Sequence, residues 1–137
     1  GQVIANRAFL AGAAGGCQAE IGSGSAMAAA AICHVKGADA ETMGHAAAMA
    51  LKNLMGLVCD PGGGLVEVPC QKRNATAASV AFVSAQIALS GVQNLISFDE
   101  AVAVMDEVGR GLPPELRETA LGGIAKAPSA CAFCAGC

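Results

Sequence analysis

The chain has 137 residues and a net charge of −3, with 54% hydrophobic and 14% charged residues. This length fits one domain with a substantial core. Because the chain has so few charged residues, we expect part of its surface to be covered by another part of a larger assembly. The lack of a basic cluster and of Trp and Tyr argues against nucleic-acid binding, and no apolar run is long enough for a membrane helix. The chain begins at Gly1 without a leader-like segment, so we expect it to start inside a longer polypeptide.

The first half predicts two alanine-rich helices joined by glycine turns. Cys17 lies in a glycine-rich turn, and a Gly-Ser loop over 22–25 follows it. Alanine favours a helix over 26–36, with Ser25 as its N-cap. Asp39 is a suitable N-cap for a second helix that runs to about Gly56.

The second half predicts three further helices. Pro61 and the glycines after it indicate a loop, residues 65–68 a short extended piece, and Asn74 an N-cap for a helix over 75–90. The helices that follow cover about 101–110, behind an S-x-x-E capping box, and 115–120, behind two prolines. The small-residue-rich last residues, 122–137, predict coil.

Seven cysteines without a secretory signal favour metal binding or catalysis over disulfides. Cys17, Cys59 and Cys70 each lie within two residues of Gly or Pro, where the backbone can approach an iron–sulfur cluster closely. Three thiolates leave one iron of a 4Fe–4S cluster without a protein ligand, which is what a Lewis acid needs. The alternative is three buried free cysteines that pack as small apolar residues.

Two other groups of residues are candidates for chemistry. Cys131, Cys134 and Cys137 have a ferredoxin-like spacing, which allows a second function, a non-catalytic electron-transfer or metal-binding module. Lys72, Arg73 and Asn74 follow Cys70 directly, where they suit a substrate carboxylate. The sequence indicates no catalytic base.

Three segments resemble the iron–sulfur-dependent L-serine dehydratases, in the C-terminal half of their α chain. They read GGCQAEIGSGSAMAAA, LKNLMGLVCDPGGGLVEVPCQKRNA and EVGRGLPPELRETALGGIA, and the resemblance covers nearly all of 15–125. It implies a cytoplasmic, oxygen-sensitive 4Fe–4S lyase that converts L-serine to pyruvate and ammonia, with cluster ligands at Cys17, Cys59 and Cys70. In some relatives a C-terminal cysteine also reaches the cluster; Cys137 has a suitable position for this, and Cys131 and Cys134 are equally able to do so.

The resemblance also implies missing parts. The family's α chain has a further N-terminal region, and a β chain or domain completes the enzyme, so we expect an oligomer and an incomplete active site in this chain. The expected fold is all-α: a compact helical domain with glycine-rich cluster-binding loops over 1–125 and a cysteine-containing tail over 126–137.

Overall fold

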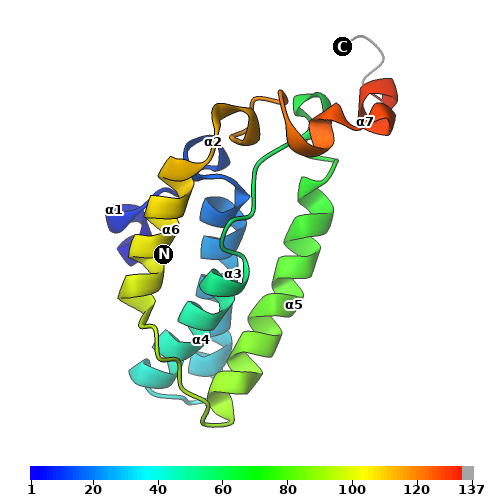
Figure 1. Ribbon diagram of the computed structural model, residues 1–137. Coiled ribbons are helices and arrows are strands. Elements are labelled where there is room, and N and C mark those ends of the chain that lie inside the picture. The colour runs from blue at the N-terminus through cyan, green and yellow to red at the C-terminus, as the bar shows by residue number, and fades with distance from the viewer. Residues whose placement is uncertain (134–137) are drawn as a thin grey trace.

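The computed structural model describes residues 1–133. Four long helices run roughly along one direction (Figure 1). Their bounds, and those of the three short helices, are α1 Gln2–Arg7, α2 Gly12–Gly15, α3 Ser23–Val35, α4 Ala40–Asn53, α5 Cys70–Leu89, α6 Phe98–Gly111 and α7 Pro128–Phe133. A π-turn spans Gln18–Gly22, and 3-10 turns span Gly62–Gly64, Pro114–Leu116 and Gly123–Lys126.

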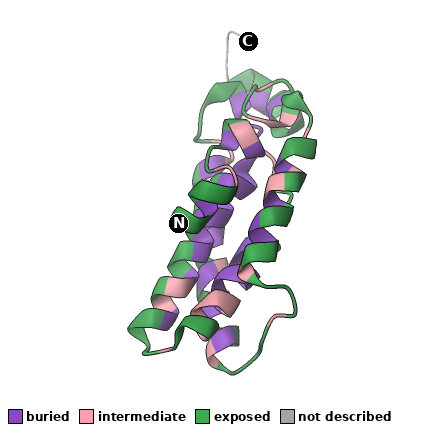
Figure 2. Cartoon of the chain, turned by 90° about the vertical axis from the view of Figure 1, so that its left-hand side faces the viewer, coloured by how far each residue is buried: buried purple, intermediate pink, exposed green. Residues whose placement is uncertain are grey.

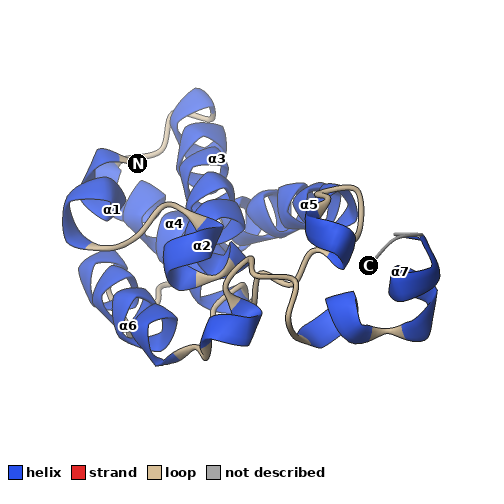
Figure 3. Ribbon diagram, turned by 90° about the horizontal axis from the view of Figure 1, so that it is seen from above, coloured by secondary structure: helices blue, strands red, loops and turns tan. Residues whose placement is uncertain are grey.

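The all-α class is confirmed, since residues 1–133 contain helices and loops but no strand (Figure 3). None of the described helices is long and apolar enough to cross a membrane. The only β-type pairing within these residues is an isolated bridge between Cys59 and Arg117. The boundary at residue 125 stays a prediction.

Alanine builds the core between α3, α4 and α5. Ala29, Ala50 and Ala85 are fully buried there, with Cys33 beside them. Small side chains let helices approach closely, and alanine costs no side-chain entropy in a helix. A second core joins α1, α3, α4 and α6 around Leu51 and Met105, and the buried residues form a continuous band along the bundle (Figure 2).

Two predicted helix starts are confirmed and two are wrong. Asp39 caps α4 by accepting from Thr42 N at 2.8 Å, and the Ser97–Glu100 capping box precedes α6. The Gly-Ser segment 22–25 is helical and not a loop, and Ser25 lies inside α3, where its Oγ donates to Ala77 O of α5 instead of capping the helix. Helix α5 begins at Cys70, five residues before the predicted start.

Three other predictions fail near the end of the bundle that carries α2 and α7. In place of the helix predicted over 115–120, the chain forms only a 3-10 turn over Pro114–Leu116. The extended piece predicted over 65–68 is absent, because residues 66–69 form a turn, although Leu65 has extended backbone angles. Part of the tail is helical, since α7 packs against the Gly62–Gly64 turn. Short-range composition could not reveal this packing, because it depends on a contact between segments about 60 residues apart in sequence.

Candidate functional site

Cys17 lies on the turn that leaves α2. The preceding residue, Gly16, has φ +78°, and a Cβ there would lie 2.8 Å from Leu57 O and 2.7 Å from Leu112 Cδ1. Only glycine fits this conformation without strain. The tight turn therefore brings Cys17 against the segment that leads to Cys59.

The buried side chain of Gln18 stabilises this turn through hydrogen bonds, a role that the sequence did not reveal. Its Nε2 donates to Gly15 O at 2.9 Å and to Met105 O at 3.0 Å, while its Oε1 accepts from Gly56 N at 2.8 Å. The side chain is 1% exposed, so all three bonds form away from water, where leaving them unmade would be costly. Gln18 thus ties the Cys17 turn to α6 and to the end of α4.

Cys59 is held through its backbone. Its N–H donates to Leu116 O at 2.8 Å, and its carbonyl accepts from Glu118 N at 2.7 Å. Glu118 has φ +66°, a strained conformation for a residue with a side chain. The pairing places Glu118 next to Cys59, although the two are far apart in sequence.

Cys70 is the first residue of α5. Asn74, one turn later, donates from Nδ2 to Cys70 O at 3.0 Å, so Asn74 lies inside the helix and does not cap it. Helical geometry carries the side chains of Cys70, Arg73 and Asn74 toward neighbouring positions on the first turns.

The structure brings together the three cysteines singled out from the sequence. Cys17, Cys59 and Cys70 share one buried cluster with Ile21 and Ala77, and they are 1%, 4% and 8% exposed. Burial, and then the nearby Cys17 thiol, raises the pKa of both Cys59 and Cys70. Three thiolates in this cluster therefore disfavour one another unless a cationic group binds between them.

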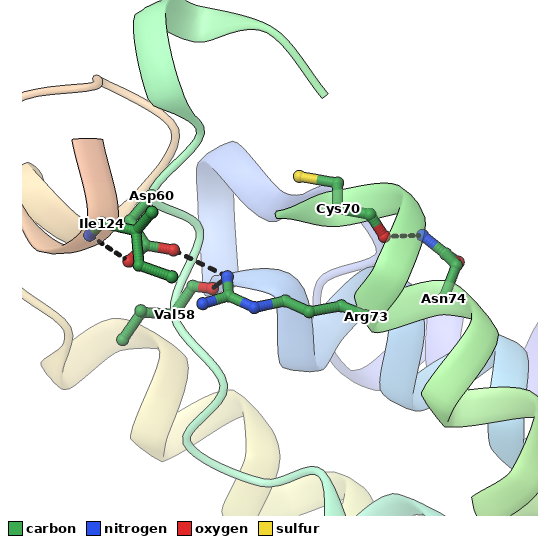
Figure 4. A network of polar contacts seen from close by, with 6 residues as sticks. All are labelled: Val58, Asp60, Cys70, Arg73, Asn74 and Ile124. Atoms are coloured by element: carbon green, nitrogen blue, oxygen red, sulfur yellow. Dashed lines mark hydrogen bonds and ion pairs between the residues drawn. The ribbon is translucent and has the colours of Figure 1, made fainter. Parts of the chain in front are cut away.

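Arg73 contacts protein groups on the Cys59 side of the cluster. Its Nη1 forms an ion pair with Asp60 Oδ1 at 2.6 Å and donates to Val58 O at 3.0 Å (Figure 4). Asp60 Oδ2 accepts from Ile124 N at 2.7 Å. Lys72 lines a separate hollow, together with Leu54, Leu57, Pro69, Arg73 and Thr76.

A cleft of about 200 Å³ opens beside two of the thiols. Its lining residues are Glu20, Cys59, Pro61, Val66, Cys70, Gln71, Asn74 and Glu118. A methyl group on Gly12 would lie 3.0 Å from Cys59 Sγ and 3.4 Å from Glu20 Oε2, so this carboxylate and this thiol are close neighbours. The cleft thus combines two carboxylates, two amides and buried sulfur.

The other cysteines are separate from this cluster. Cys33 is buried in the alanine core, where its Sγ contacts Ala85 O at 3.9 Å. Cys131 is exposed on α7, and Cys134 and Cys137 lie outside the described residues. Within 1–133, no three His, Cys, Asp or Glu side chains are arranged to hold a single metal ion. A 4Fe–4S cluster poses a different requirement, since each thiolate binds a different iron.

Fold and site together define a helical domain with a buried three-thiol centre at one end. The model of the family described as "Serine dehydratase alpha chain" matches residues 1–125. The chain belongs to the serine dehydratase alpha chain family.

Three relatives illustrate the relationship. The "Probable L-serine dehydratase, alpha chain" of Bacillus subtilis is 53% identical over 94% of this chain and 43% of its own length. The protein of the same description from Latilactobacillus sakei is 52% identical over 97% of this chain and 64% of its own length. The "L-serine dehydratase, alpha chain" of Peptoniphilus asaccharolyticus is 54% identical over 91% of this chain and 43% of its own length. The chain thus spans less than two thirds of the length of these relatives.

Proposed function

We propose that this chain is the cluster-binding part of an L-serine dehydratase, which converts L-serine to pyruvate and ammonia. The observation that carries the proposal is the convergence of three buried thiols from three separate segments. Membership of the family supports the same reaction. Cys17, Cys59 and Cys70 are the proposed ligands of a 4Fe–4S cluster.

The donor set fits such a group. Burial, and then the nearby Cys17 thiol, raises the pKa of Cys59 and Cys70, so a bound cationic iron would stabilise the buried thiolates and relieve the repulsion between them. When bound, the cluster supplies an iron with an open coordination position, which acts as a Lewis acid. The backbone pairing at Cys59 and the Gly16 turn before Cys17 hold two of these ligands in place.

The cleft beside Cys59 and Cys70 is the proposed substrate site. Serine carries an ammonium group and a carboxylate, and the cleft offers a partner for each. The carboxylates of Glu20 and Glu118 suit the ammonium group, and the amides of Gln71 and Asn74 suit the carboxylate. Because the lining contains no cation, we propose that groups outside this chain complete the carboxylate site.

The three residues predicted to bind the substrate carboxylate, Lys72, Arg73 and Asn74, do not all line this cleft. Asn74 lines the cleft. Arg73 has its guanidinium on Asp60 and Val58 O, and Lys72 lines another hollow. Either cation would need a rearrangement to reach a substrate in this cleft.

The same proposal includes partners. We propose that the chain corresponds to the C-terminal half of an α chain, acts in the cytoplasm and assembles with the remaining α-chain region and a β chain. Exposed apolar residues on α5, Phe82 at 60% and Val83 at 57%, support a covered surface there. The catalytic base is proposed to come from one of these partners or from the cleft.

A chimera tests the function. The matching segment of the Bacillus subtilis α chain would be replaced by this chain, and pyruvate formation from L-serine would be measured anaerobically with the β chain present. We expect activity that air abolishes and that Cys59→Ala removes, while Cys33→Ala, a buried thiol outside the site, retains it. Equal activity in both variants would contradict the proposal.

A further inference from the structure

Asp60 is a buried carboxylate with partners in two other parts of the chain. It is 2% exposed, and its two oxygens have different roles. Oδ1 accepts from Arg73 Nη1 at 2.6 Å, and Oδ2 accepts from the backbone N–H of Ile124 at 2.7 Å. Figure 4 shows Asp60 between these two donors. A buried carboxylate needs such compensation, because its desolvation is costly.

The Arg73 contact links two of the proposed ligands. Asp60 follows Cys59 directly, and Arg73 lies one helical turn after Cys70 on α5. Arg73 Nη1 also donates to Val58 O at 3.0 Å, so it binds both neighbours of Cys59, Val58 and Asp60. Short charge-assisted bonds of this kind fix geometry as well as adding stability. The pair therefore sets the position of Cys59 relative to Cys70.

The Ile124 contact brings in the C-terminal segment 122–133. Gly123 has φ +60°, and a Cβ there would clash with the Asp60 carboxylate, so this close approach needs glycine. The segment also encloses an apolar cavity of about 290 Å³ against Gly62 and Val68, with Ile124 and Ala130 in its lining. It thus packs on the loop between Cys59 and Cys70.

We propose that Asp60 is a positioning residue of the three-thiol centre, which fixes Cys59 against Cys70 while the segment 122–133 is docked. This inference rests on the proposed function. Docking supplies the second hydrogen-bond donor that the buried carboxylate requires. By thermodynamic linkage, whatever occupies the thiol centre must then stabilise the docked segment, and docking must stabilise the occupied centre to the same extent.

The test uses the intact chain loaded anaerobically with iron and sulfide. One readout is the rate of iron release to a chelator, and the other is tryptic cleavage after Lys126, which lies in the segment. In the wild type, loading should slow cleavage at Lys126 about tenfold, because a ligand stabilises the state that it binds. In Asp60→Asn, iron release should be about tenfold faster, as expected for a lost charged hydrogen bond, and loading should no longer protect Lys126.

Asp99→Asn is the control for the loss of an Asp–Arg pair as such, here an exposed one. It removes another Asp–Arg pair of the same length, Arg7 Nη1 to Asp99 Oδ1 at 2.6 Å, between α1 and α6, and it should behave as wild type. If Asp60→Asn does not fold by circular dichroism, Gly123→Ala replaces it, since its methyl group pushes Asp60 away from Ile124. Gly37→Ala controls for the backbone strain alone, because Gly37 also has a positive φ, +80°, but a Cβ there would meet open space.

The outcomes separate the two proposals. A wild-type chain that takes up no cluster contradicts the proposed function and this inference with it. A loaded wild type whose iron release and Lys126 protection are unchanged by Asp60→Asn or Gly123→Ala overturns the positioning role alone. The positioning role is also overturned if Asp99→Asn or Gly37→Ala loses the protection of Lys126 against trypsin. In that case the coupling between loading and docking of the segment 122–133 would not depend on Asp60.

Discussion

At the scale of single residues, the site around the thiols includes side chains whose position there could not be predicted from their neighbours in sequence. Glu118 lies far from any cysteine in sequence and reaches Cys59 only through a backbone pair between the two segments. Gln18 follows Cys17 directly, but its contacts with Met105 and Gly56 depend on helix packing. The cysteines themselves could be predicted, because thiols beside Gly and Pro are conspicuous.

We predict that Glu118→Gln weakens serine binding and leaves the cluster in place. In the chimeric enzyme its KM for L-serine should rise about tenfold, because a charged hydrogen bond to the ammonium group becomes a neutral one. Iron content should not change. Glu115→Gln, on the same exposed segment but outside the cleft, is the control, and an equal rise in KM there would contradict the role of Glu118.

At the scale of elements, the turn between α2 and the π-turn sets the position of Cys17. We predict that Gly16→Ala lowers the free energy of unfolding by about 3 kcal/mol, from left-handed backbone strain and steric overlap together. Gly37→Ala has the strain but no overlap, so its loss should be about 1 kcal/mol. Urea denaturation of both variants measures the difference, and similar losses would show that overlap of the new methyl group with Leu57 and Leu112 does not contribute.

Helix boundaries show why sequence reasoning succeeded at some elements and failed at others. Local capping chemistry predicted the starts of α4 and α6, because Asp39 and the Ser97–Glu100 box act within four residues. The start of α5 at Cys70 was missed, because Asn74 resembled a cap but bonds to Cys70 O inside the helix. Ser25 was misread in the same way, since its partner is Ala77 on another helix.

At the scale of the whole molecule, two groups of cysteines are candidates for binding the proposed cluster: the three-thiol centre and the C-terminal cysteines. We predict that the triple variant Cys131→Ser, Cys134→Ser, Cys137→Ser keeps the wild-type iron content after anaerobic reconstitution. The physical reason is that Cys17, Cys59 and Cys70 are already gathered and buried, whereas Cys131 is exposed. An electron-transfer or metal-binding module built on the tail would lose its iron in this variant.

The most direct test of the central claim is the iron and sulfide content per chain after anaerobic reconstitution, compared between Cys59→Ala and Cys33→Ala. Both variants remove one buried thiol, but only Cys59 belongs to the three-thiol cluster. We predict about four irons and four sulfides per chain in the wild type and in Cys33→Ala, as a 4Fe–4S cluster requires, and a large loss of both in Cys59→Ala. Undiminished iron in Cys59→Ala, or an equal loss in Cys33→Ala, would contradict the account.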